Sequence, residues 1–307
     1  MSNNINWGKI YESTAWGSGV TDNNISWGKS YADLAGGGGT PFVGLLDTYS
    51  GAAAAYSLRQ LSSNYSGDAI VVRRASDNTT QAIGFVNNEL DTTSLESFCS
   101  GTDGFVTTWY DQSGNGYDAA QTTSSAQPKI VSSGSTILDN GKPSVQFDGS
   151  DDHIDTGTQI GLANTGSIYV ISSIDDTSDF RAQFSNGYSD DIWVGSVLNS
   201  QKLQIWTNNV NSAGTTNVFS LNTQFLASYF MKSGGSKIYH NNSIYFTSSK
   251  TFTRPNSTTT NGAIGRDETY SAYEFSGKMQ EILFFADNTD ADNNGINTNI
   301  NDHYSIY

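Results

Sequence analysis

The sequence is poor in cysteine, proline and basic residues. Its 307 residues include one cysteine, Cys99, so no disulfide can form within the chain. Lysine and arginine total 15 against 30 acidic residues, and the net charge of −15 argues against nucleic acid and anionic membranes as partners. No apolar run approaches the roughly 18 residues of a membrane-spanning helix. The N-terminus lacks the basic and apolar regions of a secretory signal peptide.

Aromatic and small polar residues are abundant instead. The chain has 16 Tyr, 15 Phe and 31 Gly, and aromatic residues make up 12% of it. This profile is typical of an all-β protein with many turns, and it argues against disorder. We therefore predict a β-sandwich or jelly roll built from these strands: 69–74, 105–110, 144–147, 167–172, 191–195, 202–206, 225–230, 236–239 and 278–285.

Two helices are expected beside the strands. The alanine-rich stretch from Gly51 to Ser62 has apolar residues at helical spacing. A C-terminal helix capped by Asp290 is predicted because Ile296, Ile300 and Tyr304 recur every four residues on one face. The same stretch resembles the start of an EF-hand loop, but Asn301 stands where the bidentate glutamate belongs.

The first 35 residues contain a repeat. Residues 3–11 return as residues 23–31, and a third Trp-Gly pair lies between them. The segment is too short and polar to form its own core, so its aromatic residues need a surface, which is either this chain's own sandwich or a partner. Such repeats resemble those at the N-termini of phage virion proteins. We predict a docking arm over 1–35, a glycine-rich linker over 36–41 and a sandwich domain over 42–307, with these docking residues: Trp7, Tyr11, Trp16, Trp27 and Tyr31.

The strand ending at Tyr110 is followed by the polar turn Asp111-Gln112-Ser113-Gly114, where ligand-facing groups are expected. This turn belongs to a larger set of matching motifs: Ala55–Arg59, Tyr65–Gly67, Val72–Asp77, Phe98-Cys99, Trp109–Gly114, Ala263–Asp267 and Tyr273–Gly277. Together they resemble the catalytic domain of the GH54 α-L-arabinofuranosidases and its non-enzymatic relatives in tailed-phage structural proteins. The resemblance implies a concanavalin-like, LamG-type β-sandwich.

The resemblance also implies roles for particular residues. Asp267 matches the family's acid/base, and Thr207 stands at the position that matches the glutamate nucleophile. A threonine without a base cannot replace a carboxylate nucleophile. The family's vicinal disulfide is absent, since Gly104 stands where the partner of Cys99 belongs. We therefore predict no catalytic residues and no enzyme activity; Glu268 or Glu274 acting with Asp267 is the alternative.

No cofactor is predicted. The three histidines lack metal-ligand spacing, so no metal site is assigned. The run Asp148-Gly149-Ser150-Asp151-Asp152 could provide oxygen ligands for Ca²⁺ or form a solvated turn. The tentative ligand-binding residues are Asp111, Gln112, Asn208 and Asp267.

The leading interpretation is a non-enzymatic phage virion protein of the decoration, head-fibre or tail-fibre type. Its arm would dock on capsid or tail proteins at the virion surface, in many copies or as a homo-oligomer, and its sandwich could display a site for host-surface glycans. The alternatives are a GH54-like arabinofuranosidase or other glycan-degrading virion enzyme, and a free carbohydrate-binding module.

Overall fold

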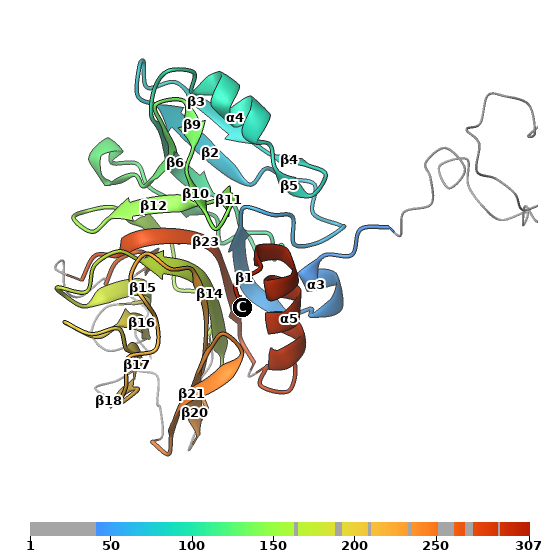
Figure 1. Ribbon diagram of the computed structural model, residues 1–307. Coiled ribbons are helices and arrows are strands. Elements are labelled where there is room, and N and C mark those ends of the chain that lie inside the picture. The colour runs from blue at the N-terminus through green and yellow to red at the C-terminus, as the bar shows by residue number, and fades with distance from the viewer. Residues whose placement is uncertain are drawn as a thin grey trace, which may run out of the picture. The chain divides into compact units, whose positions relative to one another are not determined.

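The computed structural model describes residues 41–162, 165–187, 192–207, 210–232, 235–250, 261–267, 273–287 and 289–307. The chain divides between Phe42 and Val43, and everything below concerns the second part. No described helix is long and apolar enough to cross a membrane. The fold is an all-β sandwich, as predicted (Figure 1).

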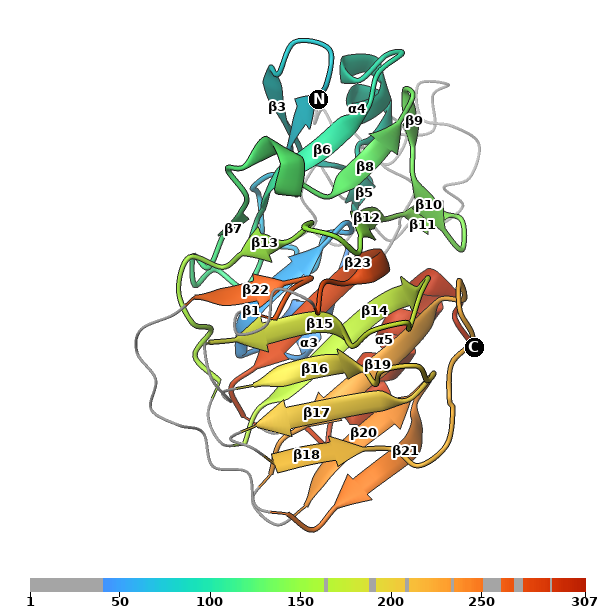
Figure 2. The ribbon, with the colours of Figure 1, turned by 90° about the vertical axis from the view of Figure 1, so that its left-hand side faces the viewer.

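The first sheet of the sandwich presents its strands side by side in Figure 2. Neighbouring strands are antiparallel and follow this order: β18 (Val210–Ala213), β17 (Leu203–Thr207), β16 (Trp193–Ser196), β15 (Arg181–Asn186), β22 (Gly262–Ile264) and β13 (Ile154–Asp155). The strand β22 arrives from far along the chain and separates β15 from β13.

The second sheet packs against the first. Its antiparallel order is β21 (Ser243–Ser248), β20 (Ser236–His240), β19 (Phe225–Phe230), β14 (Ser167–Ile174) and β23 (Ser276–Phe285). The long strand β23 has two partners on its other side: β1 (Ala52–Ser57) and β12 (Val145–Asp148).

The core lies between the two sheets. On the first sheet, alternate residues such as Phe184, Val194 and Ile205 are fully buried and belong to one cluster with Ile282 of the second. The rings of Phe184 and Phe284 are 4.5 Å apart and join the sheets. Because side chains alternate along a strand, the neighbours of these core residues lie on the outer face of the first sheet.

Two helices cover the outer face of the second sheet. They are α5 (Asn293–Tyr304) and α3 (Leu45–Thr48), and their apolar residues form a second core with the strands. Arg59 connects α5 to β23. Its Nε lies 2.8 Å from Oε2 of Glu281 on β23, and its Nη1 donates a hydrogen bond to Asn299 on α5. Among the described residues, no helix covers the outer face of the first sheet.

A smaller β-rich part extends the first sheet through β7 (Ala119–Ala120). It contains β2 (Ile70–Arg74), β3 (Thr80–Ile83), β6 (Gly104–Trp109), β8 (Lys129–Ser132) and β9 (Ser135–Thr136). The helix α4 (Thr92–Phe98) packs on it through Leu95, and the fully buried Cys99 follows. The remaining elements are short: β4 (Phe85–Val86), β5 (Glu89–Leu90), β10 (Leu138–Asp139), β11 (Lys142–Pro143) and η1 (Ser124–Ala126).

Two local predictions are wrong. The stretch predicted as a helix from Gly51 is the strand β1, because its alanines fit the tight space beside β23 and short apolar runs do not distinguish helix from strand. The C-terminal helix exists, but Asp290 does not cap it. Asp290 instead accepts hydrogen bonds from Lys237 and Tyr239, and Asp292 precedes the first helical residue.

Candidate active site

One row of side chains crosses the outer face of the first sheet. Directly opposite residues of neighbouring strands point to the same face. The pairings Asp155↔Ala263, Ala263↔Ser185, Ser185↔Trp193 and Trp193↔Trp206 therefore place a carboxylate, two small residues and two indoles in line. The small residues Ala263 and Ser185 therefore separate the carboxylate at one end of the row from the two indoles at the other.

The aromatic end has unsatisfied polar groups. The Nε1 atoms of Trp193 and Trp206 are buried and have no hydrogen-bond partner among the residues that the structure describes. Gln204, two residues before Trp206 and on the same face, is fully buried, and neither atom of its amide has a partner in the described part of the chain. A buried unsatisfied group costs about 1–3 kcal/mol, so native proteins keep few without a reason.

Aromatic contacts connect this row to the segment before β23. The ring of Phe180 lies 6.2 Å from that of Trp193 and 5.0 Å from that of Tyr273. The Ala182 N–H donates to the carbonyl of Tyr273 over 3.1 Å. The segment that carries Glu274 therefore runs along the start of β15, next to Trp193.

Arg181 ties that segment to the acidic loop after β12. Its Nη1 donates to the carbonyls of Glu274 (3.0 Å) and Gly149 (3.5 Å). Its Nη2 pairs with Asp176. The Arg181 guanidinium therefore connects three chain segments. It contacts the backbone of Gly149 and Glu274 and the carboxylate of Asp176, and it does not pair with the carboxyl of Glu274.

Glu274 is a buried carboxyl. It is 5% exposed, and its Oε2 has no hydrogen-bond partner among the described residues. Burial is the largest cause that raises the pKa of Glu274 to about 8; Arg266 opposes it, and the charges of Asp151, Asp148 and Asp267 contribute to the rise. We therefore expect Glu274 to carry a proton at neutral pH, with the negative charge of Asp267 as one contribution.

Asp267 owes its place to a glycine. Gly265 follows β22 with a φ of +86°, and a Cβ there would meet the ring of Phe147 at 2.6 Å. Only glycine fits this bend, which lies directly before Arg266 and Asp267. Arg266 Nη2 lies 3.4 Å from Asp155 Oδ1, so it belongs to the acidic end of the row. Asp267 is partly exposed.

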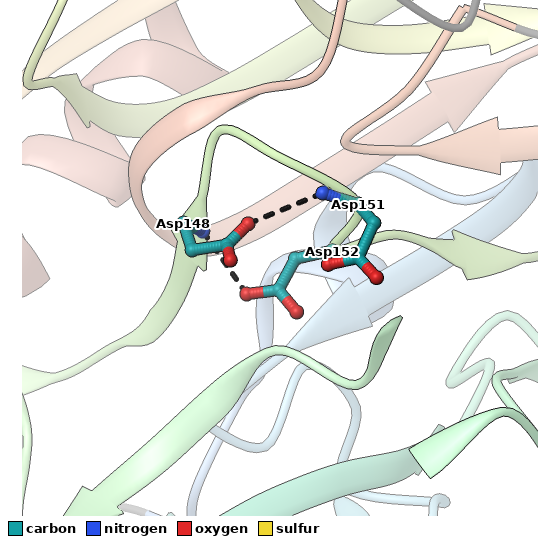
Figure 3. A group of neighbouring side chains, drawn as sticks. All are labelled: Asp148, Asp151 and Asp152. Carbon is teal, nitrogen blue, oxygen red and sulfur yellow. Dashed lines mark hydrogen bonds between the residues drawn. The ribbon is translucent and has the colours of Figure 1, made fainter. Parts of the chain in front are cut away.

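Three aspartates gather in the loop between β12 and β13 (Figure 3). The Asp148 carboxylate accepts from the N–H groups of Ser150 (2.8 Å) and Asp151 (3.3 Å), and the Asp148 N–H donates to Asp152 Oδ2 (3.0 Å). One oxygen from each of the three aspartates lies within 4.8 Å of the others. Burial, and then the charge of Asp148, raise the pKa of Asp152 to about 7.

The structure separates the predicted site residues. Asp111 and Gln112 are buried: the Asp111 carboxylate accepts from Ala55 N–H (2.8 Å), and the Gln112 amide bonds the backbone of Ser57 and Leu61. They brace β1, which corrects the expectation that they face a ligand. Of the predicted site residues that the structure describes, only Asp267 acts electrostatically on the buried Glu274. Asn208 and the docking residues Trp7, Tyr11, Trp16, Trp27 and Tyr31 lie outside the described residues.

Thr207 does not lie on the face that carries the row. It alternates with Trp206 and shares the inner face with Ile205, in the core. If this strand is aligned with the family motif one residue out of register, every side chain is assigned to the wrong face of the sheet. Gln204 and Trp206, and not Thr207, are the β17 residues on the outer face. The absence of a carboxylate at Thr207 therefore says nothing about the chemistry of that face.

Sequence reasoning missed the importance of Gln204 and Arg181. Glu274 was an alternative partner for Asp267, but nothing in its sequence context showed that it is buried. The signal available for Gln204 was its place in an alternating strand beside Trp206. Its lack of a partner depends on what packs around it, which the sequence does not contain.

Comparisons with known proteins match this architecture. The family model "Alpha-L-arabinofuranosidase B, catalytic" matches residues 33–150. This segment covers β1 to β12 and ends before Asp152, Asp267 and Glu274. Among curated proteins, none matches the sequence.

Solved structures of GH54 enzymes share the fold. An arabinofuranosidase complexed with arabinofuranosyl-α-1,2-xylobiose has a TM-score of 0.63 and 17% identity, over 84% of this chain and 64% of that one. A mutant GH54 arabinofuranosidase soaked with 4-nitrophenyl α-L-arabinofuranoside has a TM-score of 0.66 and 18% identity, over 83% of this chain and 64% of that one. The chain has a GH54-like fold and spans less than two thirds of the length of these structures.

These findings correct the functional prediction. The family model describes a catalytic region, and the similar structures are of GH54 enzymes. They contradict the prediction of a non-enzymatic virion protein and favour the alternative, an arabinofuranosidase-like enzyme. The virion partners, the glycan target and the virion location remain untested predictions.

Proposed function

We propose that this chain is a glycoside hydrolase that removes α-L-arabinofuranosyl groups from a glycan. The observation that carries the proposal is the pair of Glu274 and Asp267 in a GH54-like fold. Glycoside hydrolysis needs one carboxyl that holds a proton and one carboxylate that is ionised. In this proposal Glu274 holds the proton and the partly exposed Asp267, whose charge acts on it, is ionised.

Glu274 is the proton donor in this proposal. Its raised pKa keeps the proton at neutral pH, and the donor protonates the oxygen of the leaving sugar. Asp267 is the ionised carboxylate, which attacks the anomeric carbon or activates a water. The family resemblance implies the acid/base role for Asp267, and the electrostatics favour Glu274 for the proton. The row from Ser185 to Trp206 lies beside them and would hold the sugar.

The first experiment measures release of 4-nitrophenol from 4-nitrophenyl α-L-arabinofuranoside. We expect activity in the wild type and a loss of about 10²–10⁴-fold in Asp267→Asn and Glu274→Gln. The matched control is Asp302→Asn, an exposed aspartate on α5, which should keep full activity. No release by the wild type, or full activity of Glu274→Gln, would contradict the proposal.

A second substrate separates the two roles. A sugar is a poorer leaving group than nitrophenol and depends more on a proton donor. Glu274→Gln should therefore lose more activity on arabinofuranosyl-xylobiose than on the nitrophenyl substrate, whereas Asp267→Asn should lose a similar factor on both. The reverse pattern would return the donor role to Asp267. The anomeric configuration of the first product, followed by NMR, distinguishes nucleophile from water-activating base.

A further inference from the structure

One buried arginine connects Glu274 to two neighbouring segments. Arg181 is the first residue of β15, and its side chain is 8% exposed. Its Nη1 donates to the carbonyl of Glu274 over 3.0 Å and to that of Gly149 over 3.5 Å. Both contacts are with backbone atoms, so they fix the chain that carries Glu274 without satisfying its carboxyl.

The backbone is also held on both sides of Glu274. The Ala182 N–H donates to the carbonyl of Tyr273 over 3.1 Å, and the Phe275 N–H donates to the carbonyl of Gly265 over 2.8 Å. Arg181 supplies the bond between these two, to the Glu274 carbonyl itself. Residues 273 to 275 are therefore each bonded to a neighbouring segment, and the middle bond depends on one side chain.

The acidic loop after β12 lies against the same segment. Gly149 has a φ of +75°, and a Cβ there would meet the Cβ of Ser276 at 2.7 Å. The charges of Asp148 and Asp151 in this loop raise the pKa of Glu274. By bonding the carbonyls of both chains, Arg181 holds these charges close to the carboxyl on which they act.

A guanidinium in this place would oppose those charges if it were unpaired. A cation beside a buried carboxyl favours the ionised form, and Arg266 lowers the pKa of Glu274 in this way. The Nη2 of Arg181 instead pairs with the carboxylate of Asp176, and its Nε donates to the Asp176 carbonyl over 3.2 Å. The charged groups around Glu274 therefore come from three segments: Arg266 and Asp267 after β22, Asp148 and Asp151 after β12, and Asp176 and Arg181 before and at the start of β15.

We propose that Arg181 is a positioning residue for Glu274 and that Asp176 balances its charge, so that the guanidinium fixes the backbone without ionising the carboxyl. The inference rests on the proposed function, in which Glu274 is the proton donor. An arginine suits this task because its N–H donors form a rigid fork that contacts two carbonyls and a carboxylate at once. Arg181 acts through Glu274 and is assigned no contact with the sugar.

Titration of the Glu274 carboxyl by ¹³C NMR tests the charge balance without any substrate. The signal is assigned by its loss in Glu274→Gln. We expect a midpoint of about 8 in the wild type. In Asp176→Asn the midpoint should be about one pH unit lower, because the guanidinium then acts on Glu274 without its counter-ion. The Asp176 side chain is 44% exposed and asparagine keeps an acceptor oxygen, so this variant should fold.

The matched control is Asp77→Asn. It removes the carboxylate of another arginine–aspartate pair, that of Arg74, which is not among the groups around Glu274. This variant should titrate like the wild type. A midpoint in Asp176→Asn that is equal to that of the wild type, or higher, would overturn the charge balance.

Arg181→Lys tests the positioning role. Lysine keeps the charge but lacks the rigid fork. On arabinofuranosyl-xylobiose we expect kcat to fall about 10–100-fold, while KM changes less than about twofold, because the donor is misplaced and the sugar site is intact. An unchanged kcat, or a rise in KM alone, would overturn this role. If the wild type hydrolyses no arabinofuranoside, the proposed function fails, and the NMR titration of Asp176→Asn still decides the charge balance.

Discussion

Two buried glutamates seven residues apart have opposite surroundings. Glu281, inside β23, is fully buried and accepts hydrogen bonds from Ser57, from two nitrogens of Arg59 and from Tyr304. Glu274, just before β23, is nearly as buried, but its Oε2 has no partner among the described residues, and three aspartates as well as Arg266 act on its charge. The first arrangement stabilises the fold. The second retains a destabilising group, which is typical of a site kept for chemistry.

The largest effect should come from breaking the satisfied pair. In Arg59→Ala the carboxylate of Glu281 stays buried without its cation, which costs about 3–5 kcal/mol. Denaturant unfolding measures the loss, and Arg74→Ala is the control because its pair with Asp77 is exposed and contributes little. If both variants lost the same stability, the contrast between buried and exposed pairs would fail.

A second test sharpens the comparison through pH. The folded-state pKa of Glu274 is raised from 4.5 to about 8, so the stability that its protonated form contributes is fully present below pH 4.5 and is lost as the pH rises to 8. Glu274→Gln should match the wild type near pH 4.5 and exceed it by about 1–3 kcal/mol above pH 8. Unfolding curves at the two pH values measure this. A variant that is less stable than the wild type above pH 8 would show that Glu274 is satisfied.

The two buried glutamines of the first sheet extend the same contrast. Gln204 has no partner among the described residues, whereas the amide of Gln183 bonds the hydroxyls of Ser172 and Tyr229. Gln204→Met should stabilise the chain by about 1–2 kcal/mol and weaken sugar binding, while Gln183→Met should destabilise it. Chemical denaturation and sugar titration are the measurements. Destabilisation by Gln204→Met equal to that by Gln183→Met would remove Gln204 from the binding face.

The last prediction concerns a histidine. Burial lowers the pKa of His240 from 6.5 to about 4, and its Nε2 has no partner in the described part of the chain. Its contribution to stability is present above pH 6.5 and is lost as the pH falls toward 4, with a slope of at most about 1.4 kcal/mol per pH unit. His240→Gln should flatten this part of the stability curve. An unchanged slope would assign it to His303, whose pKa burial lowers to about 3.

The strands and helices that could be predicted are those whose pattern is set by residues close to one another in the sequence. Alternating strands such as 167–172 and 278–285 were found, because the period of two places one face in the core. The helix ending at Tyr304 was found from its repeat of isoleucines. The alanine run at 52–55 was misread, because only its pairing with β23 distinguishes a strand from a helix there.

The site was less accessible than the fold. Asp267 was singled out from a motif, and the structure places it within electrostatic reach of Glu274. The turn at Asp111 and Gln112 has a conspicuous sequence, and yet its polar groups support β1 from inside. A sequence motif shows which side chains are present, but it does not show whether their polar groups already form hydrogen bonds within the fold.

The sequence alone determined the fold class, the strand-rich body and the acidic character of this protein, because composition and short-range periodicity decide them. Only the tertiary structure decided which acids matter. Burial, the insertion of β22 beside β15 and the bend at Gly265 bring residues from separate segments into one electrostatic environment. A pKa depends on that three-dimensional environment, so Glu274 and Glu281 acquire different properties although the sequence presents them alike.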